Sequence, residues 1–363
     1  MNEQNDLQHD LHQGTRILVI IGMLALISIS IKQAQATFEW LLFAVYLAIL
    51  GAPLVLWLER KRIPYVVAVL LIVAGFAIVL VVVGVVVGTS LNSFYSDLPS
   101  YQALLQKRIS SLQALLAANG ITITDSLLVN QVDPEAVKRF TASLLRGFGF
   151  ALFELVMILV TVMFILLEAS SFPVKLRAIL GDPKKDFHLF MKFIYDIQHY
   201  MNIKSAISLT VGILVGVWLF ILGVDFPLLW GFLAFLLHYV PNIGALIAAV
   251  PAVLLAFTQF GVGRAAQVAI GYLAVEFILG NLVEPMLMGR KLGMSTVVVI
   301  VSLIFWGNLL GIVGVFLCIP LTMTLKFVFE NNKNTRWIAV LLGPEMTPAK
   351  TPPASVKGDD RMT

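Results

Sequence analysis

Charge is scarce in this sequence. Only 13% of its 363 residues are Asp, Glu, Lys or Arg, whereas 59% are hydrophobic. A soluble domain of this size could not bury so much apolar surface, so the composition excludes a soluble globular protein and predicts an all-α polytopic membrane protein. We therefore expect the net charge of +4 to report which loops face the cytoplasm, with lipid rather than nucleic acid as the partner.

Cysteine and catalytic motifs are scarce as well. Cys318 is the single cysteine, which excludes a disulfide framework within the chain, and its apolar surroundings predict an inert hydrophobic side chain. The sequence lacks the HExxH, GxSxG and GxxxxGK[ST] motifs and any cysteine–histidine cluster with metal-ligand spacing. We expect no enzyme activity, no cofactor, no metal site and no nucleotide-driven pump.

Long apolar segments are what the sequence does contain. A helix needs roughly 20 apolar residues to cross a hydrocarbon layer of about 30 Å. The first apolar segment is short and resembles a signal peptide, but the basic Lys32 before the cleavage-like Ala34-Gln35-Ala36 favours an uncleaved anchor. The sixth and the eighth are too long for one crossing. The segments are 17–31, 38–58, 64–90, 147–167, 203–222, 227–257, 265–285 and 296–328.

The polar stretches between these segments set the expected topology. Basic residues gather at 59–62 and within 168–202, and short basic loops remain in the cytoplasm. Both tails, 1–16 and 331–363, are then cytoplasmic, and the second is partly disordered because it is rich in proline. Transmembrane helices would occupy 17–90 and 147–167, with a transport core at 203–330.

Segment 91–146 is expected to be an extracytoplasmic helical insert. Apolar residues recur there at spacings of three and four, which predicts an amphipathic helix outside the bilayer. A second helix would begin near Asp133, where Pro134 suits the first turn. These helices would either pack on their own subunit or form a seam with another subunit.

Segment 227–257 is predicted to be a re-entrant helical hairpin. A single crossing would place Arg290 and Lys291 on the wrong face of the membrane. As one helix, its 31 residues would span about 46 Å, which is longer than the hydrocarbon layer. We predict that it enters from outside, turns at Pro241-Asn242-Ile243-Gly244 and returns to the same side.

Segment 296–328 is predicted to be a second hairpin that enters from the cytoplasm. It breaks at Trp306-Gly307-Asn308, and both hairpins have an asparagine at the break with a glycine and a proline further along. Unpaired main-chain groups cannot face lipid, so broken helices at membrane depth must be buried or line a cavity. Two oppositely oriented hairpins therefore indicate a transport site.

Among the ionisable residues within or beside the apolar segments, we single out Glu154, His238, Glu276 and Glu284. A charged side chain is expensive in hydrocarbon and usually functional, so these residues are candidates for ion or proton coupling. Other roles stay open. Glu284 precedes the helix-ending Pro285 and could be hydrated, Glu276 could make a packing hydrogen bond, and His238 could be a buried neutral imidazole.

Three runs carry a family resemblance: PNIGALIAAVP at 241–251, NLVEPMLMGRKLGMS at 281–295 and FWGNLLGIVGVFLCIPLT at 305–322. They are similar to the C-terminal half of the autoinducer-2 exporter family of bacterial inner-membrane permeases. The resemblance implies a multi-pass homopentamer with two hairpins around a small-molecule substrate and an elevator-like movement. It also implies the substrate-binding residues, which are Pro241, Asn242, Gly244, Asn281, Trp306, Gly307 and Asn308.

Three functions remain as hypotheses. The first is a secondary exporter of a small, polar, uncharged metabolite such as autoinducer-2, which would need hydrogen bonds more than charge. The second is an antiporter in which Glu276 or Glu284 exchanges Na⁺ or Li⁺ for H⁺. The third is a membrane scaffold without transport activity, for which broken helices would be a costly device.

Overall fold

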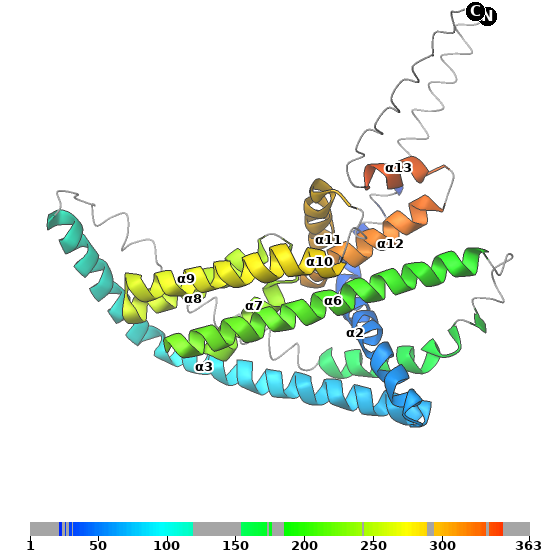
Figure 1. Ribbon diagram of the computed structural model, residues 1–363, viewed down its shortest axis with the longest axis horizontal. Helices are drawn as coiled ribbons and strands as arrows, with labels where there is room; N and C mark the ends of the chain where they lie inside the picture. The colour runs from blue at the N-terminus through cyan, green and yellow to red at the C-terminus, as the bar shows by residue number, and fades with distance from the viewer. Residues whose placement is uncertain are drawn as a thin grey trace, which may run out of the picture.

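A computed structural model of the chain describes residues 22–23, 26, 29–30, 32–118, 154–172, 174–175, 185–241, 243–288, 294–331 and 334–343. Every regular element in these ranges is a helix (Figure 1). Several features of the sequence interpretation fall outside them: the tail 1–16, most of the apolar segment 17–31, the second helix of the insert, Asn242, the basic pair Arg290–Lys291 and the proline-rich tail from 344 onward.

Helix α3 (Tyr65–Ala118) joins the predicted transmembrane and external regions in a single element. It follows α2 (Gln35–Arg60), and its 54 residues correspond to about 81 Å, far more than the hydrocarbon layer. The domain boundary predicted at 90/91 is therefore not a break in the helix. Thr89 and Ser90 bond to carbonyl groups one turn back, at 2.8 and 2.7 Å, so these polar residues continue the helix instead of capping it.

Helix α6 (Lys185–Leu222) likewise begins earlier than the apolar segment predicted at 203–222. Its first half lies within the segment predicted as a basic cytoplasmic stretch. Aromatic residues explain the continuation, because Phe193 stacks on Phe327 of α12 (Cys318–Glu330), with ring centroids 4.2 Å apart. In Figure 1, α6 runs beside α9 (Val262–Val275) over part of its length.

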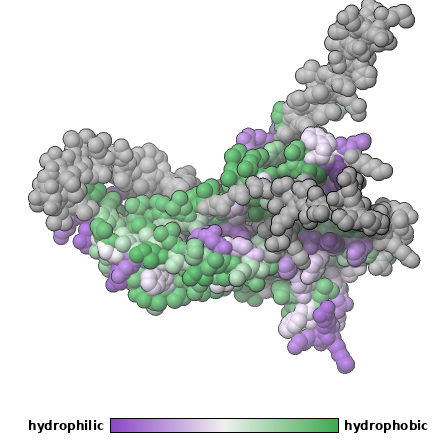
Figure 2. Space-filling view, turned by 45° about the horizontal axis from the view of Figure 1, so that its top comes forward, coloured by the Kyte–Doolittle hydropathy of each residue, from purple (hydrophilic) through white to green (hydrophobic). Residues whose placement is uncertain are grey.

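Five helices among the described residues are long and apolar enough to cross a membrane. Residues 154–169 form a further helix, which overlaps the predicted segment 147–167 and ends two residues beyond it. Hydrophobic residues cover most of the visible described surface, and hydrophilic residues gather mainly towards the ends (Figure 2). The five helices are Gln35–Arg60, Tyr65–Ser111, Phe187–Leu222, Val262–Met288 and Val297–Phe316.

Helices α7 (Pro227–Leu237) and α8 (Gly244–Phe260) form the first hairpin, here called hairpin 1. The reversal is tight, since a Cβ atom at Gly244 would overlap with the carbonyl group of Leu237. The two ends of the hairpin also meet, because the Asp225 main-chain N–H donates to Oε1 of Gln259 at 3.3 Å. The segment therefore turns back on itself close to the predicted position.

The distal half of α3 holds these two ends from one side. Tyr101 donates its hydroxyl proton to Asp225 at 2.7 Å, and Arg108 donates to the carbonyl oxygen of Gln259 at 3.2 Å. The turn before α7 and the turn after α8 therefore lie at the same end of the molecule.

Helices α11 (Thr296–Phe316) and α12 form hairpin 2, whose break differs from the predicted one. The non-helical dihedrals within α11 occur at Leu310 and Gly311 and not at 306–308. The φ of 55° and ψ of −143° at Gly311 form a combination that favours glycine. The chain folds back there, because a Cβ atom at Gly314 would overlap with the carbonyl of Trp306, which is about 12 Å away in a straight helix. The predicted break is thus wrong by about one turn.

The buried apolar residues form two clusters that meet halfway along α6. The α2 cluster includes Met201, and the α7–α8 cluster includes Ile207. Between these two positions α6 carries Lys204 and Ser205, and we call this polar boundary the seam. The α2 cluster is built from α2, α3, 154–169, the first half of α6, Tyr239 and α12, and the α7–α8 cluster from α3, the second half of α6, α7, α8 and α9.

The C-terminal part of the segment predicted to be a transport core is one nearly continuous rod followed by hairpin 2. Helix α9 (Val262–Val275) passes into a π-helix, η2 (Glu276–Val283), and then into α10 (Glu284–Met288). A short helix, α13 (Arg336–Leu341), follows α12.

Candidate functional site

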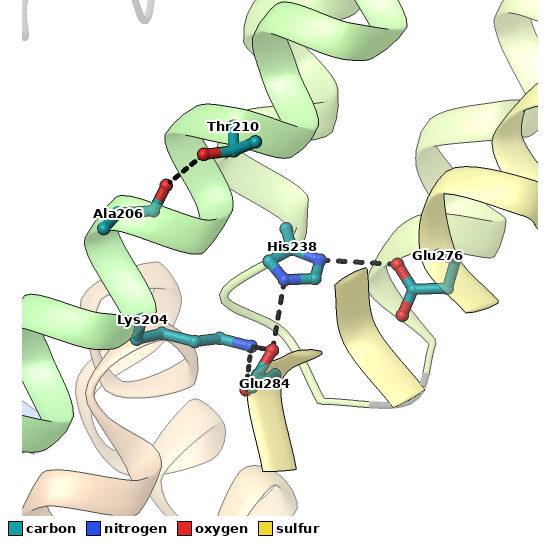
Figure 3. Close-up of polar contacts among 6 residues, drawn as sticks. All are labelled: Lys204, Ala206, Thr210, His238, Glu276 and Glu284. Atoms are coloured by element: carbon teal, nitrogen blue, oxygen red, sulfur yellow. Dashed lines mark hydrogen bonds and ion pairs between the residues drawn. The ribbon is translucent and has the colours of Figure 1, made fainter. Parts of the chain in front are cut away.

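Four ionisable side chains meet at the seam and form what we call the ionic chain (Figure 3). Lys204 donates to both carboxylate oxygens of Glu284, at 2.8 and 3.0 Å. Nε2 of His238 lies 3.2 Å from Glu284, and Nδ1 lies 3.3 Å from Glu276. The imidazole thus stands between two carboxylates, one of which also holds a lysine.

Three separate parts of the fold position these side chains. Lys204 lies at the middle of α6, where the apolar clusters on both sides bury it to 5% exposure. His238 follows the last residue of α7, and its main-chain N–H still bonds to Ala234, at 2.9 Å. Thr210, further along α6, bonds to Ala206 of its own helix and does not join the ionic chain.

The two glutamates lie at the start of η2 and directly after it. The Glu276 carboxylate lies over Gly280, where an added Cβ atom would be 2.6 Å from Oε1. A larger residue at 280 would therefore displace this carboxylate. Single π-helical turns inside longer helices occur frequently at functional sites.

The charges of the ionic chain do not cancel with a neutral imidazole. With Glu276 and Glu284 ionised, Lys204 balances one negative charge, and a proton on His238 or a bound cation would balance the other. The side chain of Glu276 is 30% exposed against 16% for Glu284, so Glu276 is the more accessible carboxylate. Within the described ranges, no group of three or more His, Cys, Asp or Glu side chains is arranged to hold a metal ion.

Unused hydrogen-bonding capacity remains around the ionic chain. Nε2 of His238 and Oε2 of Glu276 are at ion-pair distance from carboxylate and imidazole, but neither makes a well-directed hydrogen bond within the described structure. Ser208, one turn beyond Lys204, and Tyr272, one turn before Glu276, also have buried hydroxyls without a bonded partner among the described residues.

The remaining predicted residues have other surroundings. Trp306 donates its indole N–H to Thr322 at 2.9 Å, and Asn308 accepts a hydrogen bond from Lys32 at 3.2 Å. Neither contact involves the ionic chain. The other positions are Pro241, half-buried in the turn of hairpin 1; Gly244 at the close approach; Gly307 beside Val315; Asn281, exposed on η2; and Glu154, exposed at the start of 154–169.

The structure therefore brings together three of the predicted coupling residues, His238, Glu276 and Glu284, and adds Lys204. The sequence interpretation missed Lys204. Its signal was a lone lysine inside an apolar run, which is as costly there as a carboxylate and needs a charged partner.

The comparisons with known proteins agree over nearly the whole chain. The family model "AI-2E family transporter" matches residues 17–334. The chain is 35% identical over 329 residues to "AI-2 transport protein TqsA" of Escherichia coli K12, covering 91% of this chain and 96% of that protein. It is 35% identical over 339 residues to "Putative transport protein YhhT" of the same strain, covering 93% and 97%.

A similar protein also occurs in Haemophilus influenzae. Its "Putative transport protein" is 33% identical to this chain over 346 residues, covering 94% of this chain and 98% of that protein. Together with the candidate membrane spans, the family makes this a multi-pass protein of the inner membrane. The chain belongs to the AI-2E family of transporters.

Proposed function

We propose that this protein is a secondary transporter that exports a small, polar, uncharged metabolite of the AI-2 type by alternating access. One observation carries the proposal: buried polar atoms of His238 and Glu276 in the ionic chain, and of Ser208 and Tyr272 one turn away from it, make no well-directed hydrogen bond within the described part of the chain. Leaving such an atom unpaired costs about 1–3 kcal/mol. A solute with several hydroxyl groups would satisfy these atoms without adding charge.

The same proposal gives the two hairpins their place in the membrane. Hairpin 1 enters from outside, hairpin 2 enters from the cytoplasm, and both chain termini are cytoplasmic. The positions of the hairpin ends along α6 support this. Asp225, at the base of hairpin 1, follows the end of α6, whereas Phe327, near the end of hairpin 2, stacks on the first half of α6.

Movement of hairpin 1 against α2 would then alternate access in an elevator-like manner. A homopentamer, which the family resemblance implies, would cover the outward surface of α3. Only 11% of its most apolar window is buried within a single chain, which leaves area for neighbouring copies. In bacteria that use AI-2, such export would contribute to quorum sensing.

Exchange of Na⁺ or Li⁺ for H⁺ is the second candidate function. The ionic chain favours it, because its charges leave room for one exchangeable positive charge beside His238. In that case Glu276, as the more accessible carboxylate, would release a proton and accept the cation.

The experiment is a flux measurement with purified protein in sealed vesicles. AI-2, Na⁺ and Li⁺ are supplied one at a time, with and without an imposed proton gradient. The exporter predicts AI-2 flux above that of protein-free vesicles, and the antiporter predicts cation-dependent proton flux. If neither flux is observed, the scaffold hypothesis would be favoured.

Glu276→Gln separates the two candidates, with Glu59→Gln at the exposed end of α2 as the matched control. If the protein is an antiporter, Glu276→Gln abolishes proton flux because the amide cannot exchange a proton. If it is an exporter of a neutral solute, binding of AI-2 is largely retained, since the amide still forms hydrogen bonds. Cation-dependent proton flux that survives Glu276→Gln would exclude Glu276 as the exchanging group.

A further inference from the structure

A second polar group crosses the seam, built only from hydroxyls. The hydroxyl of Tyr46 on α2 lies 2.7 Å from that of Tyr239 and 2.7 Å from that of Ser205 on α6. Ser205 also bonds to the carbonyl oxygen of Met201, at 2.7 Å. Both tyrosines are less than 10% exposed. We call Tyr239, Tyr46 and Ser205 the hydroxyl chain.

Counting protons gives this chain a direction. Each hydroxyl has a single proton to donate, and the Met201 carbonyl can only accept. Ser205 therefore donates to Met201, Tyr46 donates to Ser205, and Tyr239 donates to Tyr46. All three protons are used, so the middle residue, Tyr46, cannot be removed without breaking two bonds.

The hydroxyl chain ends beside the ionic chain. Tyr239 directly follows His238, and it belongs to the α2 cluster although the helices of hairpin 1 pack in the α7–α8 cluster. Its ring contacts Tyr46, Phe235 and Phe316 edge-on, with centroids 5.7–6.2 Å apart. The ring and the hydroxyl of Tyr239 thus tie the tip of hairpin 1 to the α2 cluster.

We propose that Tyr46 and Tyr239 are positioning residues that hold His238 between Glu276 and Glu284. Hydroxyl bonds of fixed direction restrict the peptide of Tyr239 and, with it, the orientation of the neighbouring imidazole. The role of these two tyrosines in transport rests on the proposed function, because the hydroxyl chain needs to open only if hairpin 1 moves. The positioning itself does not depend on transport.

Two measurements on the purified full-length protein test the proposal without substrate. The first is amide hydrogen exchange at the tip of hairpin 1, where Val240 and Gly244 donate main-chain bonds. Tyr46→Phe and Tyr239→Phe each remove the bond between these two residues, which is the bond that reaches the tip, so each should speed exchange there by about three- to tenfold, the worth of one net hydrogen bond. The double variant should exchange no faster than Tyr46→Phe, because both changes break the same chain.

The second measurement is the ¹⁵N signal of the His238 imidazole, identified by its loss in His238→Gln. Both tyrosine variants should shift it, because the ring leaves its place between the carboxylates. A role in packing alone would not, since phenylalanine keeps the ring. Ser205→Ala should shift the signal in the same direction, and Ser205→Thr, which keeps a hydroxyl, should restore it.

Tyr195→Phe is the matched control, because this tyrosine lies on α6, the helix that carries Ser205, but is 59% exposed and stacks on His199. It should leave both the exchange rates and the imidazole signal unchanged. Wild-type imidazole signals in Tyr46→Phe and Tyr239→Phe would overturn the proposal, as would equal shifts in Tyr195→Phe. Vesicles that carry no AI-2 would contradict the proposed function and leave this result untouched.

Discussion

The two hairpins are built by the same device but have different surroundings. In each, a glycine packs against a carbonyl seven or eight residues earlier: Gly244 against Leu237 in hairpin 1, and Gly314 against Trp306 in hairpin 2. The turn of hairpin 1 places His238 among buried charges. The turn of hairpin 2 instead lies against the start of α2, where Glu39 and Gln35 approach Gly311 and Lys32 bonds to Asn308.

This difference shows that the contact that reverses the chain is independent of the ionisable groups that gather at the turn. A close glycine contact is enough to reverse the chain at both positions. Within the described residues, the turn of hairpin 1 meets ionisable groups from three other elements: Lys204 of α6, Glu276 of η2 and Glu284 of α10. We conclude that hairpin 1 carries the candidate site, and that among the described residues hairpin 2 contributes packing around it.

Lys204→Met should have the largest effect on stability among the variants that test this comparison. It leaves the Glu284 carboxylate buried without its lysine, and breaking a buried pair in this way costs about 3–5 kcal/mol of unfolding free energy. Thermal unfolding of the purified protein in detergent measures the loss. Adding Glu284→Gln to Lys204→Met should recover part of it, because the stranded charge is removed.

Lys175→Met is the control for that experiment, since Lys175 pairs with Glu168 while the two side chains are 64% and 57% exposed. An exposed pair contributes only about 0–1 kcal/mol. If Lys204→Met were as mild as Lys175→Met, the ionic chain would not be a buried network.

Gly244→Ala and Gly314→Ala test the shared device. In each, the new methyl group overlaps with a main-chain carbonyl that cannot rotate away, so each should lose about 1–3 kcal/mol of stability. The same unfolding measurement applies. Gly263→Ala on α9 is the control, because no atom lies within 4 Å of the added methyl, and it should be neutral or gain up to about 1 kcal/mol.

Trp306→Phe tests the packing role of hairpin 2. The variant keeps an aromatic ring but loses the indole bond to Thr322, so we expect a loss of about 1 kcal/mol in unfolding free energy. Thr322→Val and the double variant complete a cycle that isolates the bond. In the proposed exporter, AI-2 binding should be unaffected. A change in AI-2 affinity larger than the change in stability would place Trp306 in the site after all.

Lys32→Ala should have the smallest effect. Its bond to Asn308 is exposed, and surface substitutions of this kind change stability by no more than about 0.5 kcal/mol. A loss of several kcal/mol on thermal unfolding would mean that hairpin 2 depends on the start of α2 as strongly as hairpin 1 depends on the ionic chain.

Local properties of the sequence predicted much of this fold. The apolar runs locate the helices, and excess length together with Pro241 and Gly244 locates the reversal of hairpin 1. The break of hairpin 2 was misplaced because three glycines, at 307, 311 and 314, are each compatible with a break. Only three-dimensional contact with α2 distinguishes Gly311, since Glu39 and Gln35 occupy the space of its missing side chain.

The candidate site was predictable only in part. His238, Glu276 and Glu284 stand out individually, because ionisable residues are rare in apolar segments. Lys204, the partner of Glu284, is 34 residues before His238 and 80 before Glu284 in the sequence, so no local pattern joins these residues. The hydroxyl chain is still harder to predict from the sequence, because Tyr46 and Tyr239 are separated by 193 positions. A lone tyrosine in an apolar helix is also common and gives no signal.

The π-helical segment between Glu276 and Glu284 has a consequence of its own. A π turn holds one residue more than an α turn, and one residue of an α-helix corresponds to a rotation of about 100°. If the π turn shifted to another position along the rod, the residues between the old and the new position would rotate about the helix axis while the helix ends stayed in place. Rewinding η2 would thus change which side of the helix Glu276 and Glu284 face, without movement of a lid or a domain.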